Sequence, residues 1–200
     1  MASKDDDTEL EGLPPGQRSI KRLLRWGKDH PTIGGPVPRI DLRKWVLAIN
    51  GEVKKPLRLS WDDLQGLPAV ESVSDFHCVE GWSVPDLRWE GIRFKDVVSM
   101  VEPREAAKFV SFECADGYTT SLSLKELLGD DIILAYRLDG KYLEEGLGAP
   151  LRLVVPDKYA YKSAMWITRI KFASKKEMGY WENRGYSDTA DVWRNDRFSR

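Results

Sequence analysis

The strongest constraint on the fold is a series of short β-branched or alternating runs between residues 45 and 172. Runs of roughly four to eight such residues, separated by Gly, Pro, Asn or Asp, are typical of β-strands. The stretches that we expect to form strands are 45–49, 70–76, 108–114, 132–136, 151–155 and 166–172. This spacing predicts a domain dominated by strands.

Short helices are expected between these strands. Ser60-Trp-Asp-Asp63 resembles a helix start, residues 94–101 have an apolar face, and Ser123-Leu-Lys-Glu126 matches a capping box. The helices are too short and too irregularly spaced for regular alternation of strand and helix, so we do not expect a doubly wound parallel sheet. The predicted class is α+β, a mixed and strand-dominated fold with short helices.

The length and the two ends define the expected domain organisation. A chain of 200 residues favours one domain over two, and we place it at 19–200. Residues 1–18 are charged and punctuated by Pro and Gly, which predicts a flexible N-terminal arm. Residues 19–28 place apolar side chains among basic ones, which predicts a short amphipathic helix covering the domain, and 31–41 is predicted to be a loop.

Charge and hydropathy limit the partners. The formal net charge is −1, with 31 Lys and Arg against 32 Asp and Glu, so no field that would attract nucleic acid is expected. The N-terminal stretch is acidic and is not followed by the apolar run of a secretory signal or a spanning helix. We therefore expect a cytoplasmic protein with no direct membrane span.

The densest chemical signal is Asp75-Phe-His77-Cys78-Val-Glu80-Gly-Trp82-Ser83, at the end of a predicted strand. Cys78 has two chemical uses there, as a thiolate nucleophile or as a soft ligand for a soft metal. Neighbours on a strand point to opposite faces, so His77 is poorly placed to activate Cys78. A zinc cage is disfavoured because the chain has two histidines and no CxxC.

A second signal begins at Gly148-Ala-Pro-Leu-Arg152 and continues through Lys158 to Lys162-Ser163. Arginine, lysine and hydroxyl groups that follow a buried strand suit a phosphate or another anion. Together the two stretches indicate a thiolate site beside an anion site.

Both stretches, in this order, resemble the molybdopterin domain of the sulfite oxidase family. The likeness is closest to its short single-domain members, including the methionine sulfoxide reductase catalytic subunit type, and runs over about 31–198. It includes Gly117-Tyr118-Thr119 and the tail around Gly179-Tyr-Trp181. The resemblance implies the sulfite-oxidase-type fold and a molybdenum–molybdopterin cofactor with a single pterin.

The resemblance also implies roles for individual residues. Cys78 would be the protein's thiolate ligand to molybdenum, while Cys114 has no motif around it and is expected in the core. Leu147 departs from the family pattern, which commonly has Asn or His there, so one pterin contact would be lost or replaced. The other cofactor contacts that the resemblance implies are Glu80, Thr119 or Thr120, Arg152, Lys158, Lys162 and Ser163.

The implied activity is a two-electron oxygen-atom transfer on a small oxyanion or a sulfoxide-type molecule. The cofactor carries the difficult chemistry, and a separate carrier, either a protein or a haem or quinone system, exchanges the electrons. Arginines at the metal would favour sulfite, whereas an aromatic entrance built from Trp82, Trp89 or Tyr161 would favour a neutral oxide. Two alternatives remain: a cofactor-free binding or scaffold protein with a degenerate site, and a metal-free thiol enzyme.

Overall fold

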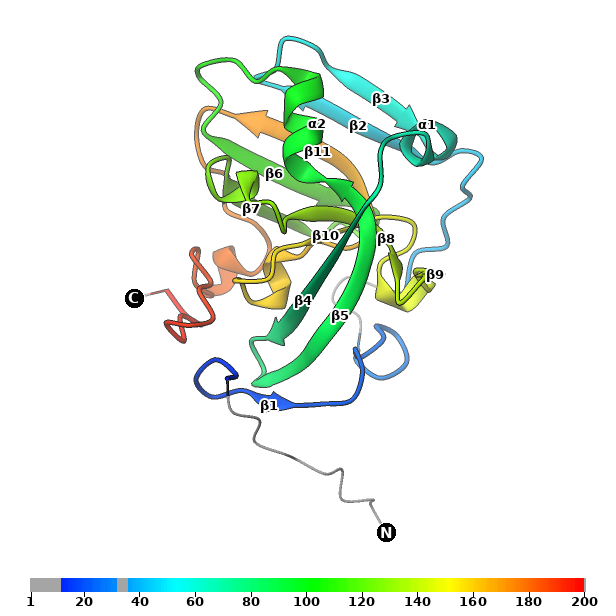
Figure 1. Ribbon diagram of the computed structural model, residues 1–200. Coiled ribbons are helices and arrows are strands. Elements are labelled where there is room, and N and C mark those ends of the chain that lie inside the picture. The colour runs from blue at the N-terminus through cyan, green and yellow to red at the C-terminus, as the bar shows by residue number, and fades with distance from the viewer. Residues whose placement is uncertain (1–11, 32–35, 200) are drawn as a thin grey trace.

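The computed structural model describes residues 12–31 and 36–199, which form two β-sheets (Figure 1). The first sheet has the strand order β1-β5-β8-β10, with β4 added beside β5 and β9 beside β8. Its strands are β1 (Arg18–Ser19), β4 (Val70–Cys78), β5 (Trp82–Arg93), β8 (Ile133–Leu138), β9 (Lys141–Tyr142) and β10 (Arg152–Val154). The strand-dominated fold that was predicted is confirmed.

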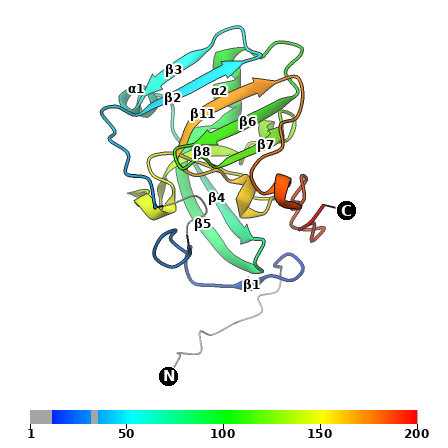
Figure 2. The same cartoon turned by 180° about the vertical axis from the view of Figure 1, so that it is seen from behind.

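The second sheet has the order β3-β2-β11-β6-β7. Its strands are β2 (Val46–Gly51), β3 (Leu57–Ser60), β6 (Phe109–Cys114), β7 (Thr119–Ser123) and β11 (Ile167–Ala173). The sheet is mixed, because β11 runs parallel to β2 and antiparallel to β6. Figure 2 shows this sheet from behind, with the β4–β5 hairpin extending away from it.

The helices are short, as expected, and all but the last lie between strands. They are α1 (Trp61–Gln65), α2 (Phe94–Val101) and the 3-10 turns η1 (Glu126–Leu128), η2 (Glu145–Leu147), η3 (Ala160–Lys162) and η4 (Glu182–Arg184). Ser60 and Asp63 form a reciprocal capping box at the start of α1. Ser123 and Glu126 exchange the same pair of bonds before η1, which is a single 3-10 turn.

The main core lies between the two sheets and beneath α2. Phe94, Val97 and Val101 bury one face of α2 against it, and Cys114 belongs to the same cluster, as predicted. A second cluster, centred on Phe76, Trp82 and Trp89, lies against the β4–β5 hairpin. This second cluster forms the base of the site described below.

The N-terminal part differs from the sequence prediction. Instead of a helix over 19–28, β1 pairs in parallel with β5 and a series of turns follows, with Leu23 buried in the second cluster. The helix is lost because the carboxylate of Asp29 accepts bonds from the side chains of Arg22 and Arg25 and from the Arg25 N–H, which closes a turn through Gly27. The segment still covers the domain.

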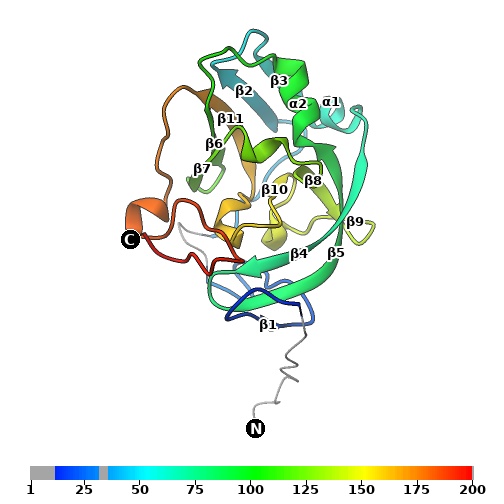
Figure 3. The same cartoon turned by 60° about the vertical axis from the view of Figure 1, so that its left-hand side comes forward.

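The predicted arm and domain boundary stay predictions, because residues 1–11 lie outside the described residues. Residues 12–18 lie against the β4–β5 turn, where the Arg18 N–H donates to the Gly81 carbonyl. The guanidinium of Arg197 donates to the carbonyls of Val79 and Gly16. Figure 3 shows the C-terminal segment beside the end of β4, with β1 beneath it.

Candidate active site

The turn between β4 and β5 presents Cys78. Cys78 is the last residue of β4, and its carbonyl accepts bonds from the Gly81 N–H at 3.0 Å and from Gln17 Nε2 at 3.1 Å. Gly81 has a φ of 92°, in the left-handed region that favours glycine, so the chain can reverse tightly there. The thiol is therefore held on a fixed turn.

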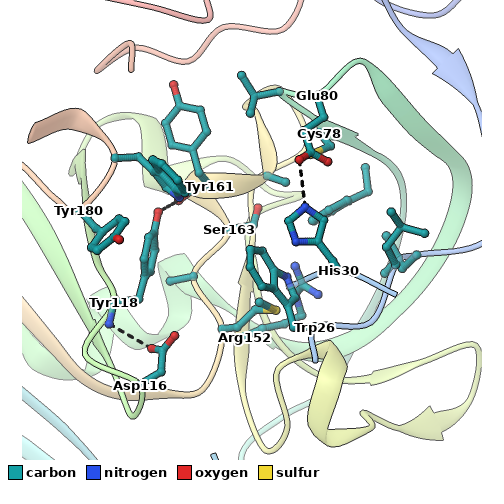
Figure 4. A pocket seen from close by; sticks show the side chains of 18 of the residues that line it. Trp26, His30, Cys78, Glu80, Asp116, Tyr118, Arg152, Tyr161, Ser163 and Tyr180 are labelled. Carbon is teal, nitrogen blue, oxygen red and sulfur yellow. Dashed lines mark hydrogen bonds and ion pairs between the residues drawn. The ribbon is translucent and has the colours of Figure 1, made fainter. Parts of the chain in front are cut away.

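Cys78 lines a cavity of about 340 Å³ beside the second core cluster (Figure 4). Three of the other expected cofactor contacts line the same cavity: Glu80, Arg152 and Ser163. The wall is rich in aromatic side chains, among them Trp26, Trp82, Tyr118, Tyr161, Tyr180 and Trp181. The cavity thus brings a thiol and a cationic side chain together inside a largely apolar enclosure, as ligand sites commonly do.

The Cys78 thiol is half-buried and donates to Glu80 Oε2, which lies 3.8 Å from Sγ. Burial, with the Glu80 carboxylate adding to it, raises the pKa of Cys78 to about 12. The free thiol therefore keeps its proton at neutral pH. Cysteine binds a soft metal as the thiolate, so a metal that binds Cys78 must displace that proton.

His77 lies on the other face of β4 and does not line the cavity. Its Nδ1 lies 2.7 Å from Ser83 Oγ, and its ring lies 6.5 Å from that of Trp193. Burial lowers the pKa of His77, which favours the neutral ring. This placement argues against His77 as the base for a Cys78 nucleophile.

Arg152 carries a charge that no carboxylate balances within the described residues. The residue is 3% exposed, and Nη1 donates to the Leu147 carbonyl at 3.0 Å. Its guanidinium carbon lies 4.9 Å from the Phe76 ring centre and 5.2 Å from that of Trp89, while Nε is buried with no partner. Burial lowers the pKa of Arg152 to about 9, so the side chain stays charged at neutral pH.

A buried cation without a counterion is costly, and this one faces a cavity. The simplest physical reason for its presence is an anion that binds in that cavity. The backbone of Leu147, the residue that departs from the family pattern, helps to hold the guanidinium in place. Cys78 and Arg152 therefore fit a group that offers both a soft metal and a negative charge.

Glu80 links the thiol to the N-terminal segment. Its Oε1 lies 3.0 Å from His30 Nε2, and its Oε2 accepts from Trp82 Nε1 at 3.1 Å. Burial raises the pKa of Glu80, but the hydrogen bonds from His30 and Trp82 outweigh burial and lower it overall. His30 also lines the cavity, with 21% of its side chain exposed.

Ser163 is part of the cavity wall and is held in place by two hydrogen bonds. Its Oγ accepts the Val155 N–H at 3.1 Å, and its N–H donates to the Ala160 carbonyl. These bonds fix the segment after η3 beside the cavity.

Three other predicted contacts lie away from the cavity in this structure. Lys158 Nζ donates to Glu126 Oε1 at 2.7 Å, and buried Lys162 pairs with Glu182. The Thr119 carbonyl accepts the Tyr180 N–H, and the alternative, Thr120, donates from Oγ1 to Glu182. Their proposed roles at the cofactor stay predictions.

The Lys162–Glu182 pair predicts a large effect on stability. Both residues are buried, and Lys162 Nζ also donates to the Ser121 carbonyl at 3.1 Å. Glu182→Gln leaves the ammonium without its nearest charge partner, so the free energy of unfolding should fall by about 3 kcal/mol in urea titrations. Lys55→Ala, which breaks the exposed pair with Glu102, should cost less than about 1 kcal/mol. Equal losses in the two variants would contradict this assignment.

Several wall residues were not selected from the sequence as site residues, among them Trp26, Asp116, Tyr118 and Tyr180. Asp116 Oδ1 accepts the Tyr118 N–H at 3.0 Å, and burial raises the pKa of this carboxyl. The sequence signal that points to them is the aromatic density around residues 118 and 180. Within the described residues, no group of three or more His, Cys, Asp and Glu side chains gathers around a possible metal position.

Fold and cavity together define a class of protein: a strand-dominated domain with a cavity suited to an anionic cofactor beside a cysteine. Residues 34–181 match the family model of the oxidoreductase molybdopterin binding domain. The chain is 39% identical over 166 residues to YuiH, an uncharacterized oxidoreductase of Bacillus subtilis, covering 82% of this chain and 84% of that protein. It belongs to the molybdopterin-binding oxidoreductases of the sulfite oxidase family, and it is an oxidoreductase.

Other similar proteins carry more specific names. The catalytic subunit MsrP of a protein-methionine-sulfoxide reductase from Campylobacter jejuni is 32% identical over 165 residues, covering 74% of this chain and 55% of that protein. The chain thus spans about half the length of that relative. The sulfane dehydrogenase SoxCD of Paracoccus pantotrophus has the same fold, with a TM-score of 0.67 at 19% identity, covering 88% of this chain and 47% of that one.

Proposed function

We propose that this protein is a molybdenum-cofactor oxidoreductase that transfers an oxygen atom to or from a small sulfoxide-type molecule. The cofactor is a single molybdopterin, and Cys78 is the protein's thiolate ligand to the metal. A separate carrier exchanges the electrons one at a time. The observation that supports the cofactor most directly is Arg152, a buried cation with an unpartnered Nε beside the Cys78 cavity.

The lining of the cavity favours a neutral oxide over an oxyanion. Trp82 and Tyr161 are in the wall, as an aromatic entrance requires, whereas Trp89 lies buried behind Arg152. Among the described residues, Arg152 is the sole arginine of the lining, and the cofactor would claim its charge. A sulfite ion would find no second guanidinium there. The methionine sulfoxide named in the Campylobacter relative is a substrate of the favoured kind.

When bound, the cofactor supplies a metal that accepts and donates two electrons and an oxygen atom. In the reducing direction a sulfoxide, two electrons and two protons give a sulfide and water. The chain's own residues bind the cofactor and shape the cavity. Arg152 faces the anionic group, Cys78 provides its sulfur, and the aromatic wall keeps bulk water out. Glu80 Oε2 holds the indole N–H of Trp82 beside the thiol.

We infer an electron partner because the proposed reaction needs two electrons that the chain's own side chains do not supply. Two electrons arrive singly from a carrier that we take to be a protein, a haem or a quinone system. Two relatives are named as subunits, the catalytic subunit MsrP and the putative subunit YedZ1 of Azospira oryzae, which supports a separate partner. No helix in the described part of the chain is long and apolar enough to cross a membrane.

The test begins with protein purified from molybdate-supplemented cells of a host that makes the cofactor. Plasma mass spectrometry should find molybdenum near one per chain, and acid release should give the fluorescence of oxidised pterin. Reduced benzyl viologen should then be oxidised by dimethyl sulfoxide, while ferricyanide reduction with sulfite should be slower. Absence of metal and pterin would favour the degenerate binding protein, and faster turnover with sulfite would overturn the substrate class.

A further inference from the structure

Two side chains from opposite ends of the chain hold the turn that carries Cys78. The Cys78 carbonyl accepts from Gln17 Nε2 at 3.1 Å, and the carbonyl of the next residue, Val79, accepts from Arg197 Nη1. Figure 3 shows the C-terminal segment beside the end of β4, where this second contact lies. Arg197 is therefore bound to the backbone one residue beyond the thiol.

The guanidinium of Arg197 is itself held from several directions. Nη2 donates to the Gly16 carbonyl at 3.0 Å, and Nε donates to Asn195 Oδ1 at 2.7 Å. The same Asn195 oxygen accepts from the hydroxyl of buried Tyr159 at 2.9 Å, and the guanidinium carbon lies 5.5 Å from the centre of the Tyr159 ring. Ordering a long side chain costs rotamer freedom, and these contacts offset that cost. Arg197 is thus a fixed part of the structure around the turn.

The charge of Arg197 is not matched by an ion pair within the described part of the chain. Its polar partners are two backbone carbonyls and an amide oxygen. The neighbouring carboxylate, Asp196, accepts instead from the Ser187 hydroxyl at 2.6 Å. Arg197 is half-buried, so water and salt screen its charge less than that of an exposed arginine. A positive charge therefore lies against the residue that follows Cys78.

We propose that Arg197 is a positioning residue for Cys78, which fixes the turn and places a positive charge beside the metal that Cys78 binds. The oxidised metal carries more positive charge than the reduced metal, so a nearby cation destabilises the oxidised form more. Arg197 should therefore raise the reduction potential of the metal, which favours the uptake of electrons that sulfoxide reduction needs. The effect on the metal rests on the proposed function, whereas the fixing of the turn does not.

The holoenzyme tests the effect of the charge. The readout is the midpoint potential of the metal, followed through the electron paramagnetic resonance of molybdenum(V) in a redox titration. Arg197→Met should lower the ratio of reduced to oxidised metal at a fixed potential about 5-fold, which is about 41 mV for one electron. Arg197→Lys keeps the charge and should change this ratio less than about 2-fold. No shift in Arg197→Met, or equal shifts in the two variants, would overturn the role of the charge.

Arg194→Met is the matched control, because it removes an arginine from the same segment. Arg194 is exposed and lies 3.7 Å from Asp191, with which it pairs. Its replacement should leave the ratio of reduced to oxidised metal within about 2-fold of wild type. A shift as large as that of Arg197→Met would assign the effect to the net charge of the chain and would overturn the specific role of Arg197.

Cofactor-free protein tests the fixing of the turn by hydrogen exchange of backbone amides. The Gly81 N–H donates to the Cys78 carbonyl at 3.0 Å and reports on the turn. Arg197→Met should speed its exchange at least about 10-fold and leave the amides of β6 unchanged. An unchanged rate at Gly81, or equal acceleration in β6, would refute the positioning role even in a protein that binds molybdenum. Faster exchange confined to the turn, in a protein that never binds molybdenum, would keep the positioning role and refute the proposed function.

Discussion

Cys78→Ser is expected to abolish activity while the pterin is retained. A hydroxyl is a harder and weaker donor than a thiolate, so the metal loses the ligand that tunes it. Loss of a residue behind a metal ligand already costs about 10- to 100-fold, so loss of the ligand itself should cost more than about 100-fold in kcat/KM. Arg152 and the aromatic wall remain, so pterin fluorescence after acid release should persist.

Cys114→Ala is the matched control, because it removes the other cysteine of the chain from the core cluster. Activity per molybdenum should stay within about 3-fold of wild type, since this side chain does not line the cavity. Full activity in Cys78→Ser, with molybdenum bound, would remove Cys78 from the metal.

Arg152→Met is expected to weaken cofactor binding and to stabilise the cofactor-free protein. Methionine keeps much of the length of the side chain but removes the buried charge. A lost charge-assisted bond is worth about 1.5–3 kcal/mol, so pterin and molybdenum per chain should fall at least about 10-fold. The same loss of an unbalanced charge should raise the free energy of unfolding of cofactor-free protein by about 1–2 kcal/mol.

In Arg152→Met, cofactor occupancy should fall while the stability of the cofactor-free protein rises. These opposite changes separate a binding role of Arg152 from a structural one. A guanidinium that served only packing, between Phe76 and Trp89, would cost stability when replaced and would leave the cofactor in place. Arg169→Met is the control, because Arg169 is partly exposed on β11 and is paired with Glu113. Cofactor occupancy should be unchanged in Arg169→Met. Normal occupancy in Arg152→Met would move the anion site elsewhere.

The strands with strong periodic signals were predictable from the sequence. The predicted 94–101 helix and the strands at 70–76 and 108–114 agree with the structure to within two residues, because their apolar faces are the faces that the core buries. β5 was missed because Pro85 and Gly91 interrupt its pattern. A Cβ added at Gly91 would lie 2.1 Å from the Leu134 carbonyl oxygen. Because β8 approaches so closely there, the position excludes the larger side chains that mark a strand in the sequence.

The site was predictable where a local motif carries the chemistry. Cys78, Glu80, Arg152 and Ser163 meet at one cavity, as their two motifs indicated. The path of residues 23–31 could not be predicted, because Trp26 and His30 are placed by hydrogen bonds to residues far along the chain, at Gly146 and Glu80. Lys162 does not line the cavity, and its ammonium pairs with Glu182, a partner 20 positions away that no local motif indicates.

The walls of the cavity come from almost the whole length of the chain, from Leu23 at one end to Tyr186 at the other. Arg197 then joins the two ends by bonding to the carbonyls of Gly16, near the start of the chain, and Val79, in the turn that follows Cys78. No growing chain that still lacks its last segment can enclose the pocket. We therefore expect the proposed cofactor to be loaded after synthesis, and a truncation near residue 180 should yield a chain that does not acquire it.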